Sequence, residues 1–293
     1  MIIGGRAFDT DNKCYVMGIL NVTPDSFSDG GMWRTVDLAV RHAESMAADG
    51  ADIIDIGGES TRPGHERISE QEEIDRAVPV VEAVHGRFDV PISIDTYKSA
   101  VAEAALSAGA AMVNDVRGLK GDAAMAPLLA GCGAACCLMH NRTDMDYADF
   151  IRDMMGDLAE SVRIAREAGV GADRIVLDPG IGFAKTYEMD LVAMKRLDMI
   201  AGLGYPVMLG ASRKRVVGTA LGLPVHERLE GTLATTVIAV MSGCAFVRVH
   251  DVKESKRAIA MTEAVLRSNN SPTEKLYDLH RGVYAKERGK RDG

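Results

Sequence analysis

Polar residues that could do chemistry follow short apolar segments at regular intervals along this chain of 293 residues. The most informative group is the loop 21–31, NVTPDSFSDGG, which comes directly after the apolar segment 15–20. Asn21 offers an amide oxygen to a hard metal ion, and Thr23 and Ser26 offer hydroxyl groups. The loop therefore indicates either a binding site delivered by a strand or an ordinary connection between a strand and a helix.

Three further polar residues, Asp95, Asn114 and Asp178, each end an apolar segment. A carboxylate can accept two parallel hydrogen bonds from an amino group and an adjacent ring N–H. If the three residues meet around one cavity, they suit a flat heterocycle that is rich in N–H donors. A metal cluster and plain capping of the strand ends are the alternative interpretations.

Positive charge gathers late in the chain, where Ser212, Arg213 and Lys214 follow one apolar segment and Arg248 and His250 close another. A lysine acts as a point charge, whereas an arginine offers a planar, bidentate group. Taken singly, each of these residues is typical of a surface salt bridge or a strand end. Together they predict a site for a phosphate or another small anion.

Two charged residues stand in or after the second apolar segment, 52–56. Asp55 lies inside it, where a buried carboxylate is costly unless it is paired or hydrogen-bonded. Arg62 follows in a glycine-opened loop beside Thr61, and its fork of donors suits a carboxylate or a phosphate. A surface salt bridge from Arg62 to a neighbouring glutamate is the alternative.

Two other features are harder to assign from the sequence. His140 ends an apolar segment, but no nucleophile is clearly paired with it and the chain has no GxSxG motif. The segment 178–186, DPGIGFAKT, is rich in glycine without the full phosphate-loop pattern. It is better interpreted as a pocket wall, in which Phe183 offers an aromatic face and Lys185 a charge.

The elements that must position these residues alternate regularly between strands and helices. Strands are expected at 15–20, 52–56, 91–94, 111–113, 134–139, 174–177, 206–209 and 245–249. Helices are expected at 36–49, from Ser69 onward, and at 98–107, 122–130, 147–168, 188–200, 227–241 and 253–267. Eight such units favour a single α/β domain over 1–268, a (β/α)8 TIM barrel whose strand ends share one mouth. An open doubly wound sheet is the alternative, and 269–293 is expected to be a polar tail.

The composition limits the classes of partner. With 47% hydrophobic and 26% charged residues the chain is typical of a soluble globular protein, and its net charge of -8 argues against general binding to nucleic acid. No apolar run approaches the length of a membrane span, so we expect a cytoplasmic protein. The five cysteines are expected to be reduced thiols in the core, with adjacent Cys136 and Cys137 on opposite faces of a strand.

With these residues placed, the chain closely resembles the dihydropteroate synthases, the folate-pathway enzymes that sulfonamides target. The resemblance runs from about residue 15 to 264. It rests on the ordered motifs MGILNVTPDSFSDGG, DIGGESTRPG, SIDT, VNDV, LMH, DPGIGF, SRK and RVHDV. It implies a (β/α)8 barrel and a homodimer. It also implies the condensation of (7,8-dihydropterin-6-yl)methyl diphosphate with 4-aminobenzoate to 7,8-dihydropteroate and diphosphate, with Mg2+ as cofactor.

The resemblance also implies roles for individual residues. Asp95, Asn114, Asp178 and Lys214 bind the pterin, Met139 and Phe183 form walls of its pocket, and Arg248 stacks on its ring. Asn21 contacts Mg2+ or diphosphate, and Arg62, Arg248 and His250 line the anion site. Thr61, Pro63, Ser212 and Lys214 border the aminobenzoate, while Thr23, Pro24, Asp25, Ser26 and Phe27 belong to a mobile loop. Asp95, Lys214 and Arg248 are the catalytic residues on this interpretation.

Some positions depart from the pattern expected of the family. Ile181 and Ala184 stand where phenylalanine and glycine are common, Met189 and Asp190 replace a frequent His-Asn pair, and the segment after His140 is short. We expect none of them to touch the site residues. They keep open a silent pterin-binding paralogue. A pterin-dependent corrinoid methyltransferase module is a separate alternative, against which the intact loop 21–31 and the run Ser212-Arg213-Lys214 argue.

Overall fold

The computed structural model describes residues 1–22, 32–59 and 67–268, with the side chains of 32–35 excepted. Eight parallel strands form its centre, in the order β8-β7-β6-β5-β4-β3-β10-β9. They are β3 (Tyr15–Asn21), β4 (Ile53–Gly57), β5 (Ile92–Asp95), β6 (Met112–Asp115), β7 (Ala135–Met139), β8 (Ile175–Asp178), β9 (Met208–Leu209) and β10 (Phe246–Val249). A parallel bridge between Leu177 and Val207 joins the two outer strands. The sheet is therefore a closed (β/α)8 barrel, and the open-sheet alternative is wrong.

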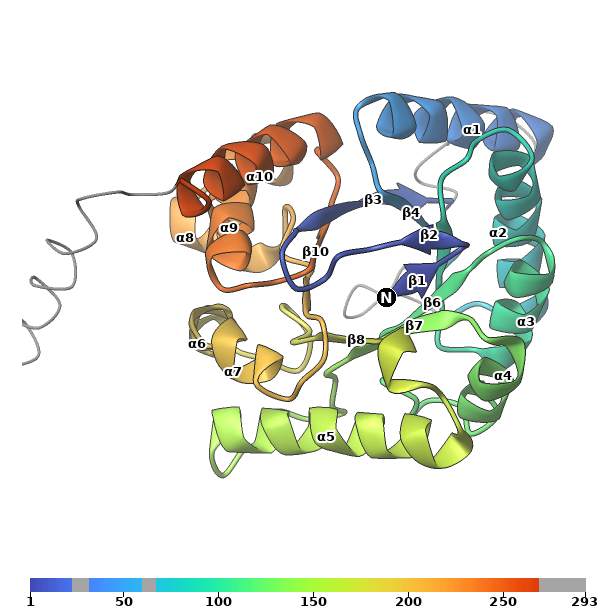
Figure 1. Cartoon of the computed structure of the whole chain (residues 1–293). Coiled ribbons are helices and arrows are strands. Elements are labelled where there is room, and N and C mark those ends of the chain that lie inside the picture. The colour runs from blue at the N-terminus through green and yellow to red at the C-terminus, as the bar shows by residue number, and fades with distance from the viewer. Residues whose placement is uncertain (23–31, 60–66, 269–293) are drawn as a thin grey trace, which may run out of the picture.

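Helices surround the ring of strands (Figure 1). They are α1 (Met32–Ala48), α2 (Glu70–His85), α3 (Ser99–Ser107), α4 (Met125–Cys132), α5 (Phe150–Ala168), α6 (Tyr187–Lys195), α7 (Leu197–Ala201), α8 (Arg215–Leu221), α9 (Leu229–Met241) and α10 (Val252–Leu266), with short 3-10 turns η2 (Ala172–Arg174) and η3 (Val225–Glu227). The helix expected at 188–200 is two helices, interrupted at Arg196. The sequence did not predict α8.

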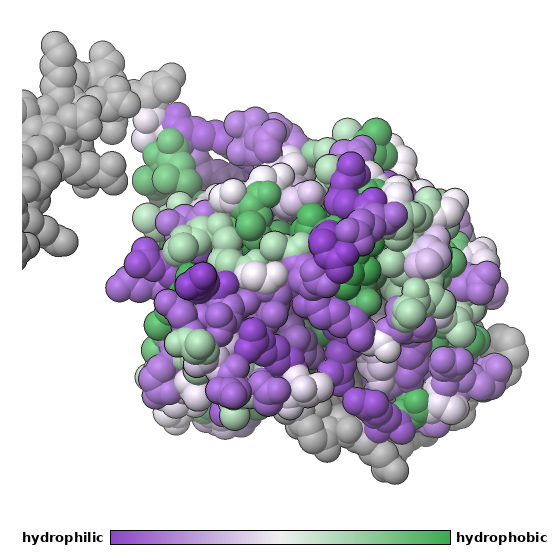
Figure 2. Space-filling view, turned by 90° about the horizontal axis from the view of Figure 1, so that it is seen from below, coloured by the Kyte–Doolittle hydropathy of each residue, from purple (hydrophilic) through white to green (hydrophobic). Residues whose placement is uncertain are grey.

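Side-chain caps explain where several helices begin. The Ser69 hydroxyl accepts a hydrogen bond from the Glu72 amide at 3.1 Å, and the Asp149 and Thr186 side chains do the same for α5 and α6. Each cap satisfies a backbone N–H that has no partner within the helix. Outside its buried stripe, α5 is polar, and the surface on that side of the molecule is largely hydrophilic (Figure 2).

An unpredicted β-hairpin precedes the barrel. Its strands β1 (Ile2–Ile3) and β2 (Arg6–Ala7) pair antiparallel and lie across the barrel end that faces the viewer in Figure 1. Ile3 and Phe8 are buried in one cluster with inward side chains of the barrel strands, including Met17 and Phe246. The hairpin thus closes the end of the barrel where the strands begin.

The two-residue period of the strands separates the inside of the barrel from its outside. On β6, Met112 belongs to the inner cluster and Val113 to the cluster under the helices, so Asn114 points inward again. On β10, Phe246 and Val247 divide in the same way, which turns Arg248 inward. The interior is therefore apolar where the strands begin and polar where they end.

The cysteines follow the same division. Cys136 and Cys137 belong to different clusters, which confirms that they point to opposite faces of β7. Cys14 and Cys244 are also buried, but Cys132 is exposed because it ends α4 beside the left-handed Gly133. The prediction of a core thiol is wrong for Cys132. Within the described residues, no helix combines the length and apolar character needed to cross a membrane.

Candidate active site at the barrel mouth

Arg248 links two aspartates inside the mouth of the barrel. Its Nε donates to Asp55 Oδ2 at 2.6 Å and its Nη2 donates to Asp95 Oδ2 at 2.7 Å. The Asn114 amide also donates to Asp55 Oδ2, at 3.1 Å. Four residues from four strands, β4, β5, β6 and β10, are thereby brought into one buried network. The sequence predicted three of them as site residues and identified Asp55 only as a carboxylate that needed a partner.

The charges in this network are not balanced. Burial raises the pKa of Asp95 to about 7, although the Arg248 guanidinium opposes the shift. Burial disfavours the charged guanidinium, but Asp55 and Asp95 outweigh that effect and raise the pKa of Arg248 above its ordinary value. Asp55 Oδ1 and Asp95 Oδ1 are buried and have no hydrogen-bond partner among the described residues. Such acceptors are rare in native proteins and are ready for donors from a ligand.

Asp178 and Lys214 form the opposite side of the mouth, after β8 and β9. Asp178 Oδ1 accepts from the Gly180 amide at 2.6 Å, so one of its oxygens caps the strand end. Lys214 Nζ donates to the Ile181 carbonyl at 2.7 Å and lies 4.8 Å from the centre of the Phe183 ring. Burial lowers the pKa of Lys214 to about 8 and raises that of Asp178.

Two glycines leave space between these groups. A Cβ atom at Gly210 would lie 3.4 Å from Asp178 Oδ2 and 3.8 Å from Lys214 Nζ, with Arg248 Cβ at 3.9 Å. A Cβ atom at Gly57 would lie 3.7 Å from Asp95 Oδ2 and 3.8 Å from Asn21 Oδ1. The missing side chains thus open the floor of the mouth between the two halves of the polar network.

Ser212 and His250 sit together beside this floor. The Ser212 hydroxyl lies 3.0 Å from His250 Nδ1 and accepts from the His250 amide at 3.2 Å. Arg213 does not join them, because its guanidinium is paired with Asp251, with Nε at 2.9 Å from Oδ2. Of Arg213 and Lys214, Lys214 is therefore the one that reaches the mouth.

The remaining predicted site residues divide into two groups. Met139 is buried on β7, and its Cγ would lie 3.2 Å from a Cβ at Gly180, which places it against the wall that carries Phe183. The other predicted residues lie outside the described residues. They are Thr23, Pro24, Asp25, Ser26, Phe27, Thr61, Arg62 and Pro63.

The expectation that the departures from the family pattern avoid the site is wrong at two positions. The Ile181 carbonyl is the acceptor for Lys214, and Asp190 Oδ1 accepts from the Gly182 amide at 2.7 Å. The Ile181 contact uses the backbone, so it does not depend on the side chain at that position. Asp190 instead holds the pocket wall with its side chain.

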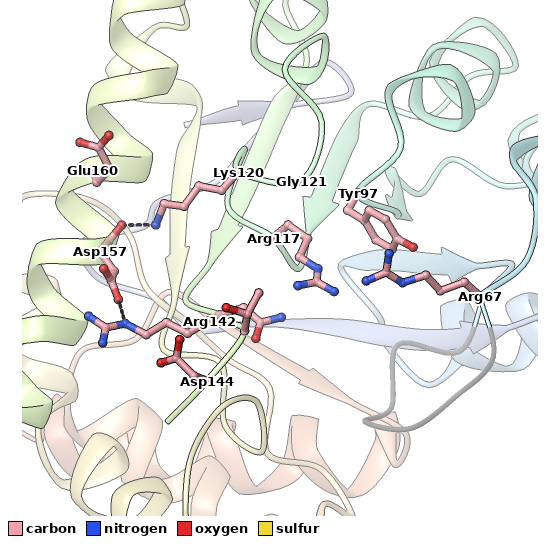
Figure 3. Close-up of a pocket in the computed structure, with 11 residues that line it drawn as sticks. Arg67, Tyr97, Arg117, Lys120, Gly121, Arg142, Asp144, Asp157 and Glu160 are labelled. Atoms are coloured by element: carbon pink, nitrogen blue, oxygen red, sulfur yellow. Dashed lines mark hydrogen bonds and ion pairs between the residues drawn. The ribbon is translucent and has the colours of Figure 1, made fainter. Parts of the chain in front are cut away.

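A separate pocket of about 570 Å³ lies on the rim, outside the network just described. Figure 3 shows its lining residues from the loops after β4 to β7 and from α5, among them Tyr97, Arg117, Arg142 and Asp157. It contains none of the predicted site residues. The orphaned acceptors of Asp55 and Asp95 therefore belong to the mouth and not to this wider hollow.

Residues 17–250 match the family model described as pterin binding enzyme. The chain is 54% identical over 268 residues to the dihydropteroate synthase of Clostridium beijerinckii, covering 91% of this chain and all of the relative. It is also 54% identical over 260 residues to that of Bacillus subtilis, covering 89% of this chain and 91% of the relative.

Solved structures give the same result. A dihydropteroate synthase from Clostridium difficile, determined in the presence of pteroic acid, superposes with a TM-score of 0.87 at 48% identity and covers 89% of this chain and all of its own. One from Xanthomonas albilineans with 4-aminobenzoic acid gives 0.87 at 38% identity, with coverages of 91% and 98%. One from Yersinia pestis with a sulfonamide drug gives 0.86 at 41%, with coverages of 92% and 99%. The chain therefore belongs to the dihydropteroate synthase family of pterin-binding enzymes.

Proposed function

We propose that the polar mouth binds (7,8-dihydropterin-6-yl)methyl diphosphate and joins it to 4-aminobenzoate, which releases diphosphate and forms 7,8-dihydropteroate. The observation that carries this proposal is the buried network of Asp55, Asp95, Asn114 and Arg248, whose two orphaned carboxylate oxygens face no donor among the described residues. The activity of the family, that of a transferase, supports it.

The pterin ring lies between the two halves of the network. Asp95, Asn114 and Asp178 receive and donate its hydrogen bonds, because a pterin carries both N–H donors and ring acceptors along one edge. Met139 and Phe183 form apolar walls, and Lys214 adds a donor beside Phe183. Arg248 is held as a fixed plane by its two carboxylates and stacks on the ring.

The diphosphate lies toward Asn21, Arg248 and His250, with Arg62 as a further donor. Mg2+ fits here, because the Asn21 amide oxygen borders the open space over Gly57 and Mg2+ often takes one or two protein ligands besides substrate phosphates. Within the described residues, no group of three or more His, Cys, Asp or Glu side chains could hold a metal, which disfavours the metal-cluster alternative. When bound, Mg2+ supplies charge stabilisation for the departing diphosphate.

The aminobenzoate lies against Ser212 and Lys214 and against Thr61, Arg62 and Pro63. The relative from Xanthomonas albilineans that was crystallised with 4-aminobenzoic acid supports this substrate. The loop residues Thr23, Pro24, Asp25, Ser26 and Phe27, which lie outside the described residues, are assigned to the substrate site in this proposal.

The reaction needs no protein nucleophile. The bond between the pterin methylene carbon and the diphosphate oxygen breaks, and the diphosphate leaves with the electron pair. The pterin delocalises the positive charge left on the carbon, and the Asp95 carboxylate stabilises it. The amine of 4-aminobenzoate then forms the C–N bond and loses a proton.

We also propose that the chain acts as a homodimer through the face formed by α6, α8 and α9. Leu191 and Val192 on α6, Leu221 on α8 and Ile238 on α9 are each at least 40% exposed. Neighbouring exposed apolar side chains are typical of a subunit interface. In light scattering we expect a dimer for the native chain and a monomer for Leu221→Glu, and a native monomer would contradict the proposal.

The decisive experiment measures diphosphate release from the pterin substrate with and without 4-aminobenzoate. We expect release to depend on 4-aminobenzoate. Pterin binding without release would indicate a silent paralogue, and methyl transfer to a corrinoid would indicate the methyltransferase alternative. In Asp95→Asn we expect pterin binding to persist and the barrier to rise by about 2.7–4 kcal/mol, the usual effect of removing one preorganised electrostatic group. Full turnover in that variant would remove Asp95 from the mechanism.

A further inference from the structure

The turn formed by residues 180–184, between β8 and α6, carries the Phe183 wall of the pocket in a strained conformation. Gly180 and Gly182 have φ angles of +69° and +83°, which glycine adopts readily, whereas Ala184 has a φ angle of +44°, which residues with a side chain rarely adopt. A Cβ atom at Gly180 would lie 2.0 Å from the carbonyl oxygen of His140, the residue that follows β7. The turn therefore packs so closely against the end of β7 that a side chain does not fit at this position. A turn with this backbone needs external contacts to keep its shape.

Side chains from several elements supply those contacts. Tyr147 donates its hydroxyl to the Ala184 carbonyl at 2.8 Å, Asp190 accepts from Gly182, and Lys214 donates to Ile181. Lys185 makes the central contact, because its Nζ donates to the carbonyls of both Gly180 and Phe183, each at 3.0 Å. One ammonium group thus ties the two ends of the turn together.

The third partner of Lys185 is a histidine. Lys185 Nζ lies 2.8 Å from His140 Nδ1, so its three N–H donors meet three acceptors. Only 2% of the lysine is exposed, and no carboxylate is hydrogen-bonded to it within the described residues. Burial lowers the pKa of Lys185 to about 7, against the attraction of Asp190 and Asp178, with Lys214 adding to the decrease and Asp157 opposing it. Burying a lysine is costly, and these three hydrogen bonds offset part of that cost.

His140 connects the buried Lys185 to Asp157, whose side chain is partly exposed. Because its Nδ1 accepts from Lys185, its Nε2 carries the proton and donates to Asp157 Oδ2 at 3.0 Å. Burial and the charge of Lys185 lower the pKa of His140 to about 3, so the ring is neutral. Asp157 is itself fixed on α5, where Figure 3 shows it joined to Arg142 and Lys120. The hydrogen-bonded series Asp157–His140–Lys185 therefore connects the rim of the barrel to the back of the pocket wall.

We propose that Lys185 is a positioning residue for pterin binding, which holds the 180–184 turn in its binding shape through His140 and Asp157. It touches neither substrate. It keeps the Phe183 ring against Lys214 and the Gly180 amide on Asp178, so the pocket is preorganised before the pterin arrives. This inference rests on the pterin pocket proposed above.

The test is titration calorimetry of the pterin diphosphate substrate with Mg2+ and without 4-aminobenzoate, together with steady-state kinetics. In Lys185→Met we expect the pterin Kd and the pterin KM to rise at least tenfold, while the aminobenzoate KM stays within twofold. Lys195→Met removes an exposed lysine on α6 and is the matched control, which we expect to bind like the native chain. A purely structural role for Lys185 would lower the melting temperature and leave both pterin constants unchanged, and that result would overturn the proposal.

A second pair of variants decides the question if Lys185→Met does not fold. His140→Gln keeps an acceptor for Lys185, whereas His140→Leu does not, so we expect near-native pterin affinity in the first and at least a fivefold loss in the second. Equal affinities in the two variants would contradict the proposal. Asp178→Ala tests the pocket separately. If it binds pterin normally, the pocket assignment fails, whereas a loss there with no loss in the Lys185 and His140 variants rejects only the positioning role.

Discussion

The two ends of the barrel interior differ in almost every physical respect, although the same strands build both. On β10, Phe246 and Arg248 are two residues apart and both point inward. Phe246 belongs to a dry apolar cluster that the hairpin β1–β2 covers, whereas Arg248 lies among carboxylates at the mouth. The difference shows how a barrel assigns stability to one end and chemistry to the other while keeping a single backbone.

Strain and unsatisfied groups are distributed in the same way. The non-glycine residues with positive φ in the described part of the chain are Leu119, Ala184 and Arg213, and all three follow strands at the mouth. Of the five buried side-chain oxygens that lack a hydrogen-bond partner in the described part of the chain, those of Asp55, Asp95 and Asp190 also lie there, and the other two belong to Ser93 on β5 and Ser255 on α10. Burial of apolar side chains at the other end of the barrel therefore offsets the free-energy cost of strain and of unsatisfied polar groups at the mouth.

The largest expected effect comes from Arg248→Met. It removes the guanidinium that pairs with Asp55 and Asp95, and breaking a buried ion pair by removing one partner typically costs about 3–5 kcal/mol. We expect that loss in urea unfolding, together with no measurable turnover. Arg248→Lys keeps the charge without the fork and should recover part of the stability but little activity. If Arg248→Met were as stable as the native chain, this would contradict the view that the buried charges at the mouth lower the stability of the fold.

Phe246→Ala is the counterpart at the apolar end. The cavity should lower the free energy of unfolding by about 3–5 kcal/mol, and Phe246→Leu by less. We expect kcat and the pterin KM to stay within twofold at a temperature where the variant is folded. A large decrease in kcat would show that the two ends are coupled.

A smaller effect concerns pH. Because the pKa of Asp95 is raised to about 7, the folded chain keeps a proton between about pH 4 and 7 that an unfolded aspartate has released. The unfolded chain binds fewer protons in this range, so this group makes stability fall as the pH rises. Relative to Asp95→Asn, the unliganded native chain should lose on the order of a few kcal/mol across that range. A constant difference between the two chains would contradict the shift.

The smallest expected effect is that of Ala184→Gly. Glycine removes the strain of a positive φ but adds entropy to the unfolded chain, so the net gain should be at most about 1 kcal/mol. Thermal unfolding measures it, with Ala211→Gly as a destabilising control. We expect unchanged kinetics, since the side-chain contacts of the turn remain. A loss of stability would mean that this turn is not strained by the residue at 184.

The sequence predicts most of the site because inward polar residues end apolar strands at regular intervals. It cannot predict the pairing, since Arg248 finds Asp55 and Asp95 across 193 and 153 residues, and no local pattern reports contacts at that separation. The sequence indicates Lys185 only as a charge in the pocket wall, because backbone carbonyls such as those of Gly180 and Phe183 leave no side-chain pattern and His140 lies 45 residues away.

The elements that the sequence did not predict were missed for different reasons. The strands of the hairpin β1–β2 are two residues long, too short for any periodicity, although Gly4 and Gly5 carry the positive φ angles of a tight hairpin turn and are a usable signal. Helix α8 spans 7 residues and includes Gly218, so its pattern resembles a loop. Arg213 stands between two predicted site residues in the sequence, but Asp251 holds its side chain elsewhere.

The closure of the barrel has a consequence for its motions. Among the described residues, β8 and β9 meet through one bridge and the hydrogen bond from the Leu177 amide to the Pro206 carbonyl, whereas β3 and β4 pair over five residues. Amide protons along this seam should exchange with solvent earlier than those of β3 and β4. Asp178 and Lys214 stand on its two sides, so a pterin that binds both completes the cylinder and slows that exchange.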